Sequence, residues 1–453
     1  MAERFFSPET RITVLNIGCE KEAGDFRDLV ELEKPDLIVI DNYEEIMLWE
    51  ALSERVKIPL VVFDDFGMAT SADLIVRPHG KGGAVTGGVI LGGPAFVPLA
   101  PDIRQSPANQ QDIDREKAIG LRLNICFGGA DPTSETIKVV PSIDRLLASL
   151  MGGRIDIIVG PGATFDPSIL AESAGRLDVD VHHSPSRSEL VRLMSSADIA
   201  LGAGGVMLWE RLHLGLPSIV VATAENQLPQ IQTAVSANAI VFVGFHSEVS
   251  GGDLAAAVAS VAGNEVLRRS LAISGRSLVD GRGTVRIAAW CKALTFETRR
   301  VEMEDAAKLL EWRTHPANWK FSWDGGPIPD LASHCKWLQQ KVAETCCHFW
   351  IVTDHDEPVG VVRFDVDAGT TTAILSIYLV PKHHGRGLGL PVYFAAEAAL
   401  RKTAAEITTI YSRIHEKNEL SIKLHRDAGF DLVQSDKRSE WLVAQKDLDR
   451  ERN

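Results

Sequence analysis

The chain has 453 residues, of which 45% are hydrophobic and 24% are charged. This composition is that of a folded protein, and at roughly 100–200 residues per domain the length predicts two to four domains. Acidic residues outnumber basic ones by 61 to 47, which gives a formal charge of −14. Such a charge repels phosphate backbones and excludes a general nucleic-acid binder, although local amides and a few cations can still hold a small anion.

The six cysteines lie far apart or adjacent to one another, without the spacing of zinc ligands. We therefore interpret them as reduced thiols and expect no bound metal. The first residues lack the basic and apolar regions of a secretion signal, and no run of eighteen apolar residues follows anywhere. These features predict a cytoplasmic protein without a membrane partner.

The first hundred residues alternate between short apolar runs and polar, helix-like segments. This alternation indicates β/α units. A stretch rich in glycine and proline at 79–102 then breaks the pattern, before a polar linker near 103–117. We expect a first Rossmann-like half over 1–105. Its predicted strands are 12–17, 36–42, 59–65 and 73–78.

A second alternating block over 118–290 has strands that are apolar throughout, which indicates parallel strands buried on both faces. Its predicted strands are 123–131, 154–160, 179–184, 197–205 and 218–223. From 296 to 453 the pattern changes to antiparallel strands with alternating side chains, at 349–354, 358–366 and 372–381. This third part is predicted to be an α+β domain.

A ligand site is predicted in the second block, at 195–230. A buried strand there ends in the glycine-rich segment 202–205, whose backbone amides can approach a diphosphate at the start of the next helix. Glu210 on that helix could hold ribose hydroxyls, or could merely favour the helix N-terminus electrostatically. The polar cluster Glu225, Asn226 and Gln227 follows the next strand, at the edge where open α/β sheets bind ligands.

Three segments in this block resemble the UDP-sugar hydrolase of pseudaminic acid biosynthesis, which has the two-domain glycosyltransferase-B architecture. They are Cys126–Pro132, Gly202–Glu210 and Ala224–Gln227. The resemblance implies a UDP-linked amino sugar as ligand and Asn226 as a catalytic residue. The substrate-binding residues that it implies are Gly129, Asp131, Ala203, Gly204, Gly205, Glu210, Glu225 and Gln227.

The first half departs from this family. The family opens with a G-x-G-H motif whose histidine activates or orients water, and about sixty leading residues that contain it are missing here, with Asn42 in place of a later histidine. Three explanations stay open. The chain start is truncated, another residue such as His79 supplies the base, or this part binds UDP-sugar without hydrolysing it. An incomplete half also leaves a sheet edge short, which predicts lower stability or a covering partner.

The third part carries a second glycine-rich turn between a strand and a helix, within 376–402. The loop amides and the helix dipole can together hold a pyrophosphate. Such turns are common, so the turn alone is weak evidence. The residues of the turn are His384, Gly385, Arg386, Gly387, Leu388 and Gly389.

This turn, with the segment 418–430, resembles the Gcn5-related N-acetyltransferase (GNAT) family. The resemblance implies acetyl-CoA as cofactor, bound by the loop and by Asn418, with the backbone near Leu379 orienting the thioester. His384 replaces the usual arginine or glutamine. His425 replaces the tyrosine that commonly protonates the leaving thiolate, so His425 is either the general acid or a histidine of the helix surface.

The rest of this domain is similar to the GNAT subgroup that acetylates nucleotide-linked amino sugars. Trp312, Arg313, His334 and Trp337 fall in its characteristic places. A tryptophan-rich stretch is more often core than sugar-binding surface. We therefore favour a packing role for the aromatic residues of 319–323 over substrate contact.

The sequence thus predicts an α/β chain with two Rossmann-like halves of glycosyltransferase-B type, the first incomplete, followed by a GNAT domain. The expected function is acetylation of the 4-amino group of a UDP-linked 4-amino-4,6-dideoxy sugar, fused to a hydrolase-like module. In one alternative the first 290 residues are a non-catalytic UDP-sugar receptor. In another the acetyltransferase acts on a protein N-terminus or a small amine. Homo-oligomerisation stays open.

Overall fold

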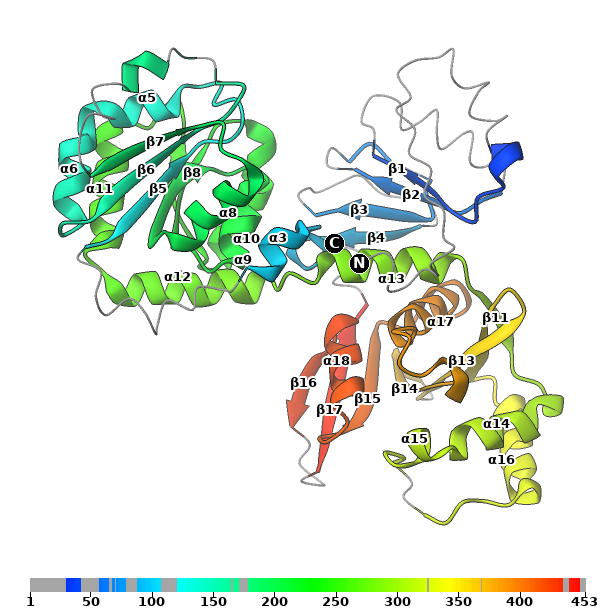
Figure 1. Ribbon diagram of the computed structural model, residues 1–453. Coiled ribbons are helices and arrows are strands. Elements are labelled where there is room, and N and C mark those ends of the chain that lie inside the picture. The colour runs from blue at the N-terminus through cyan, green and yellow to red at the C-terminus, as the bar shows by residue number, and fades with distance from the viewer. Residues whose placement is uncertain are drawn as a thin grey trace.

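The computed structural model describes residues 30–41, 57–64, 67–69, 71–78, 88–106, 120–163, 165, 167–170, 178–323, 326–367, 369–434 and 440–448. These residues form three sheets (Figure 1). The expected strand at 12–17, Asn42, His79 and most of the predicted linker lie outside the described residues. No helix among the described residues combines the length and the apolar character needed to cross a membrane.

The first sheet is parallel and has the order β1-β2-β3-β4. Its first three strands confirm the predicted ones, but the fourth lies inside the glycine-rich stretch that was expected to break the pattern. Gly88 explains the difference, because a Cβ there would lie 2.0 Å from the Ala72 carbonyl oxygen. The glycine lets the strand approach its neighbour. The strands are β1 (Ile38–Ile40), β2 (Leu60–Phe63), β3 (Leu74–Arg77) and β4 (Val89–Gly92).

The second sheet is also parallel, in the order β10-β9-β8-β5-β6-β7. β8 and β9 are buried at every residue, which confirms the prediction of strands covered on both faces. The chain reverses its direction of winding between β5 and β8, and ligands bind at such a switch point. The last strand was not predicted. The strands are β5 (Arg122–Cys126), β6 (Arg154–Val159), β7 (Val179–His183), β8 (Ile199–Ala203), β9 (Ser218–Ala222) and β10 (Ile240–Phe245).

The helices between β4 and the third sheet connect the strands of the second sheet and link the three sheets along the chain. They are η2 (Pro94–Phe96), α3 (Pro101–Gln105), α5 (Glu135–Val139), η4 (Val140–Ser142), α6 (Ile143–Ser149), η5 (Pro167–Leu170), α8 (Arg187–Ser196), α9 (Met207–His213), η6 (Glu225–Gln227), α10 (Leu228–Ser236), α11 (Gly251–Ala262), α12 (Glu265–Leu278) and α13 (Gly283–Leu294).

The third sheet is mixed, in the order β11-β12-β13-β14-β15-β17-β16. The predicted antiparallel pairing of β12, β13 and β14 is confirmed. The expected alternation in burial appears in the first half of β14, whereas β12 is buried almost throughout, because helices cover both faces of the sheet. The strands are β11 (Glu297–Arg300), β12 (Cys347–Asp354), β13 (Glu357–Val366), β14 (Thr372–Leu379), β15 (Thr409–His415), β16 (Asp431–Gln434) and β17 (Trp441–Asp447).

One face of this sheet packs on α13 and α17, and the other face packs on α14 and α16. α13 also contacts β3 and η2, so one hydrophobic core joins the first sheet to the third (Figure 1). The remaining helices are η7 (Met303–Asp305), α14 (Ala306–Thr314), α15 (Pro316–Trp319), α16 (Leu331–Ala343), η8 (Pro381–His383), α17 (Gly389–Thr403) and α18 (Glu419–Asp427).

A buried ion network ties α17 to β17. Glu397 is fully buried, and its carboxylate accepts hydrogen bonds from Lys446 Nζ at 2.8 Å and from Arg401 Nη2 at 2.7 Å. Burial alone would raise the pKa of Glu397, but Lys446 and Arg401 outweigh it and lower the pKa to about 2. The network therefore contributes stability above pH 4.5 that is lost as the pH falls towards 2.

We expect Lys446→Met to lower the free energy of unfolding by about 3–5 kcal/mol, because it leaves a buried carboxylate short of one cation. Urea denaturation at pH 7 measures this change. Lys402→Met, which alters an exposed lysine of the same helix α17, is the control and should cost less than about 0.5 kcal/mol. Equal midpoints for the two variants would contradict the expectation.

Candidate functional site

β14 and β15 run parallel and then part. Their register pairs Thr372 with Thr409 and ends at Leu375 with Ser412. β14 nevertheless continues to Leu379, and β15 continues to His415. The backbone of 376–379 therefore faces an opening between the strands, with hydrogen-bonding groups available to a ligand.

The predicted glycine-rich loop begins directly after this opening. Gly385 and Gly387 have φ values of +75° and +77°, which other residues rarely adopt. α17 then starts at Gly389 without a side-chain cap, so its first amides can bind an anion. A Cβ on Gly389 would lie 2.7 Å from Leu424 Cδ1 of α18, so the start of α17 depends on close contact with α18.

Polar contacts fix the loop to the end of β14. His384 Nε2 lies 3.2 Å from the Leu379 carbonyl oxygen, which also accepts a hydrogen bond from Asn318 Nδ2 at 3.0 Å. Arg386 Nη1 lies 2.9 Å from His383 Nδ1. His384, which departs from the family pattern, therefore anchors the end of β14. Glycines with positive φ, an uncapped helix start and Arg386 together suit the pyrophosphate of acetyl-CoA.

The predicted acetyl-CoA residue Asn418 and the predicted catalytic residue His425 lie at the start of α18 and within it. The Asn418 side chain caps the helix, since its Oδ1 accepts a hydrogen bond from the Ser421 amide at 3.2 Å. His425 is only 1% exposed, its Nδ1 donates to the Ser421 carbonyl oxygen at 2.8 Å, and its ring packs on the edge of Phe430.

The surroundings of His425 bear on both roles that the sequence allowed. Burial lowers the pKa of His425 to about 4, against the raising effect of the Ser421 hydrogen bond, so the ring is neutral at pH 7. A neutral imidazole is a poor proton donor, which argues against the general-acid role. The residue is also no surface histidine, because its side chain is in the core.

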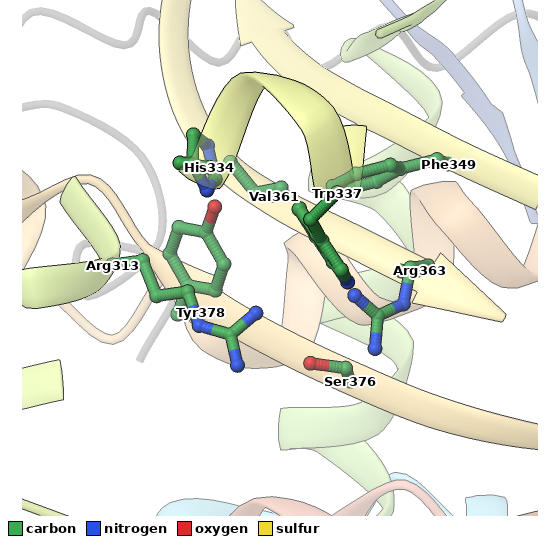
Figure 2. A pocket seen from close by; sticks show the side chains of 8 residues that line it. All are labelled: Arg313, His334, Trp337, Phe349, Val361, Arg363, Ser376 and Tyr378. Carbon is green, nitrogen blue, oxygen red and sulfur yellow. The ribbon is translucent and has the colours of Figure 1, made fainter. Parts of the chain in front are cut away.

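A small pocket, with a cavity volume of about 10 Å³, opens on the face of the sheet that α14 and α16 cover. Three residues expected from the subgroup resemblance, Arg313, His334 and Trp337, line it. Trp337 lies between two cations, with the guanidinium carbon of Arg313 5.5 Å and that of Arg363 5.2 Å from its ring centre. Figure 2 shows both guanidinium groups facing the same space. Two arginines therefore line the pocket, and Arg363 is paired with Asp365 at 2.8 Å.

The sequence did not identify the sheet residues of this pocket. Ser376 and Tyr378 line it from the part of β14 that has left β15, and Arg363 lines it from β13. Figure 2 shows the Tyr378 hydroxyl directed towards His334. Burial and then Arg313 lower the pKa of His334, and burial raises the pKa of Tyr378, so both groups are neutral at pH 7. Ser376 and Tyr378 are two residues apart on β14 and so lie on one face of the sheet, and this spacing was the clue that the sequence offered.

A second and larger pocket, of about 230 Å³, lies at the carboxyl ends of β5, β8 and β9, at the switch point of the second sheet. Four of the predicted substrate-binding residues line it: Gly129, Ala203, Gly205 and Gln227. The Gln227 side chain is fixed by hydrogen bonds with Thr223, since its Oε1 accepts from the Thr223 amide at 3.0 Å. The sequence did not single out Met207 or Phe127, which also line this pocket.

The other predicted site residues of this half do not line the pocket. For Asp131 and Glu210, contacts within the protein explain why. Asp131 is buried, and its carboxylate accepts hydrogen bonds from the Glu135 and Thr136 amides at the start of α5. Glu210 forms a two-pronged ion pair with Arg187, at 2.6 and 3.3 Å. Helix capping and ion pairing therefore occupy both carboxylates.

Gly204, Glu225 and Asn226 were also expected at the ligand site, but they do not line the pocket. A Cβ on Gly204 would lie 2.4 Å from Ile231 Cδ1, so this glycine permits packing of α10. Glu225 and Asn226 are exposed on η6, beside Gln227. The structure does not bring Asn226 to the pocket, which leaves its catalytic role as a prediction only.

Asp156, Asp180 and His182 come within 4.8 Å of one another on β6 and β7, close enough to be considered as metal ligands. Arg122 pairs with Asp156 at 3.2 Å, and Arg154 pairs with Asp180. These arginines already balance both carboxylates, which disfavours a cation at this position.

Residues 296–431 match the family described as Acetyltransferase (GNAT) domain. The matched range runs from β11 to the first residue of β16 and includes the opened strands, the glycine-rich loop and α18. The chain therefore carries an N-acetyltransferase domain of the GNAT type, which uses acetyl-CoA.

Two further proteins are similar in sequence. The spore coat polysaccharide biosynthesis protein SpsG of Bacillus subtilis is 24% identical over 200 residues, which are 44% of this chain and 57% of that protein. The uncharacterized protein MJ1062 of Methanocaldococcus jannaschii is 21% identical over 341 residues, 70% of this chain and 63% of that protein. The chain thus spans less than two thirds of the length of either relative.

Among solved structures, the spermidine N-acetyltransferase of Vibrio cholerae in complex with CoA and spermine matches with a TM-score of 0.31 and 16% identity, over 35% of this chain and 99% of that chain. A domain from Methanocaldococcus jannaschii matches with a TM-score of 0.30 and 21% identity, over 34% of this chain and 98% of that chain.

We expect His425→Phe to lower kcat for acetyl transfer by less than tenfold, whereas loss of a general acid typically costs about 100-fold or more. Steady-state assays at pH 7 measure this. His355→Phe changes an exposed histidine with 77% of its side chain accessible, and is the control. A loss of about 100-fold in His425→Phe at an unchanged melting temperature would reinstate the general-acid role.

Proposed function

We propose that this enzyme transfers an acetyl group from acetyl-CoA to the 4-amino group of a UDP-linked 4-amino-4,6-dideoxy sugar. The product would serve the biosynthesis of a pseudaminic-type nonulosonic acid in the cytoplasm, where thiols stay reduced. The N-terminal part would bind a UDP-sugar in the pocket at the switch point. The name of the Bacillus subtilis relative, which refers to polysaccharide biosynthesis, supports a sugar-related substrate.

The observation that carries the proposal is the pocket lined by two arginines beside the opened strands. Arg313 and Arg363 face one space, and Ser376 and Tyr378 come from the stretch of β14 that borders the opening. Arginine is well suited to phosphate. The Trp337 ring stacks on His334, with ring centres 5.2 Å apart, and so supports the pocket wall. A diphosphate-linked sugar fits the charge of these arginines. A polyamine or a protein N-terminus would bring a further cation close to two arginines.

The residues of the pocket suggest how the reaction proceeds. Acetyl-CoA supplies the acetyl group as an activated thioester. The anchored end of β14 at Leu379 would orient the cofactor, and the pocket would place the sugar amine beside it, so that alignment supplies much of the rate. Neutral His334, which is 4% exposed and whose Nε2 has no hydrogen-bond partner among the described residues, would accept the proton that the amine releases.

Hydrolysis by the N-terminal part has weaker support than binding. The described residues that line the switch-point pocket include no histidine and no carboxylate. Cys126 lines it, but burial raises the pKa of its thiol. These observations favour the alternative in which this part holds UDP-sugar without cleaving it.

The deciding experiment incubates the purified chain with a UDP-linked 4-amino-4,6-dideoxy-N-acetyl sugar, with and without acetyl-CoA, and follows the products by mass spectrometry. Acetylated sugar that retains UDP supports the acetyltransferase with a binding module. Release of UDP as well would establish a second, hydrolytic activity. Absence of acetylated sugar, with acetylation of a peptide or a polyamine instead, would overturn the proposed substrate.

We expect Arg363→Gln to raise KM for the UDP-sugar about 10- to 100-fold, because a hydrogen bond to a charged group contributes about 1.5–3 kcal/mol. KM for acetyl-CoA should not change. Asp365, the partner of Arg363, keeps Lys341 at 3.0 Å, so the fold should persist. Lys336→Gln, at an exposed position of α16, is the control. An unchanged KM for the UDP-sugar would rule out this anion site.

A further inference from the structure

Helix α13 precedes the acetyltransferase domain, yet it contacts that domain closely. Its Trp290 is fully buried and stacks on Phe394 of α17, with ring centres 4.4 Å apart and planes 12° apart. Its other side meets the first part of the chain, where a Cβ on Gly283 would lie 2.1 Å from the Val97 carbonyl oxygen. α13 is therefore held from both sides (Figure 1).

Two arginines at the start of α13 converge on the last residue of α18. Asp427 is 6% exposed, and its carboxylate pairs with Arg282 through both Nε and Nη2. Arg286 Nε donates a hydrogen bond to the Asp427 carbonyl oxygen at 3.0 Å. Arg286 also donates to the Ala95 carbonyl oxygen at 2.9 Å and pairs with Asp280. It therefore links α18 to the first part of the chain.

The position of Asp427 explains why these cations matter. A carboxylate at the C-terminal end of a helix adds to the negative end of the helix dipole and destabilises the last turn. Burial makes an uncompensated charge there more costly still. Arg282 balances the carboxylate, and Arg286 satisfies a terminal carbonyl group that has no partner within the helix.

The last turn of α18 bears directly on the acetyl-CoA loop. Leu424, three residues before Asp427, lies against Gly389, where α17 begins. The first amides of α17 are the ones that can hold the pyrophosphate. A shift of α18 would therefore displace Leu424 and with it the start of α17.

We infer that Arg282 and Arg286 are positioning residues for acetyl-CoA binding, and that the N-terminal part of the chain completes the acetyltransferase site by holding α18 in place. The effect runs from Arg282 to Asp427, then from Leu424 to Gly389. The acceptor plays no part in it, so it can be tested with CoA alone.

The test uses the full chain and measures the dissociation constant of CoA by isothermal titration calorimetry. Arg282→Gln should weaken CoA binding about 3- to 30-fold, the range seen for residues that act through packed neighbours. The double variant Arg282→Gln/Asp427→Asn should recover most of that loss, since no buried charge is left unbalanced. Arg269→Gln alters an arginine of α12 with 76% of its side chain exposed, and should leave CoA binding unchanged.

A merely structural role predicts a different result. In that case Arg282→Gln would lower the melting temperature and leave the dissociation constant of the folded protein unchanged, which would overturn the inference. If Arg282→Gln does not fold, Arg282→Lys serves as the test, because it keeps a cation beside Asp427 and loses the two-pronged contact. An unchanged dissociation constant in Arg282→Lys would then be equally decisive against positioning.

Discussion

The burial of α13 is the contact on which the arrangement of the chain depends. Its apolar side chains, Trp290 foremost, fill the space between the first sheet and α17 of the acetyltransferase domain. Large aromatic side chains dominate the energetics of such interfaces, and stacked rings add to the area that they bury. The two parts are therefore not independent units on a flexible tether. They share a hydrophobic core, and the polar contacts of Arg282 and Arg286 fix the helix ends around it.

Both candidate sites lie where strands end or separate. In the second sheet the winding reverses between β5 and β8, and the chain leaves a pocket at the carboxyl ends of these strands. In the third sheet β14 and β15 part after four pairs, which frees backbone groups of β14. In each case glycines next to the strand ends keep side chains away from the ligand position. The paired strands thus form a rigid frame, and the candidate sites lie where that pairing ends.

Basic side chains gather at the candidate sites although the chain as a whole is acidic. The chain carries a net charge of −14, yet Arg313 and Arg363 line one pocket and Arg386 stands in the glycine-rich loop. Net charge governs long-range encounter, whereas a bound anion responds to the groups within a few ångströms. An acidic protein can therefore hold anionic substrates, provided that the cations are placed by the fold.

The sequence by itself determined most of the parallel strands, the antiparallel strands β12 to β14, the glycine-rich loop and much of the switch-point pocket, because hydrophobic runs and glycine turns act over short distances. It did not determine the neutral state of His425, the engagement of Asp131 and Glu210 in internal contacts, or the convergence of Arg313 and Arg363. Burial and ion pairing between segments far apart in the chain decide these features. Only the tertiary structure brings such segments together, and so only it could decide them.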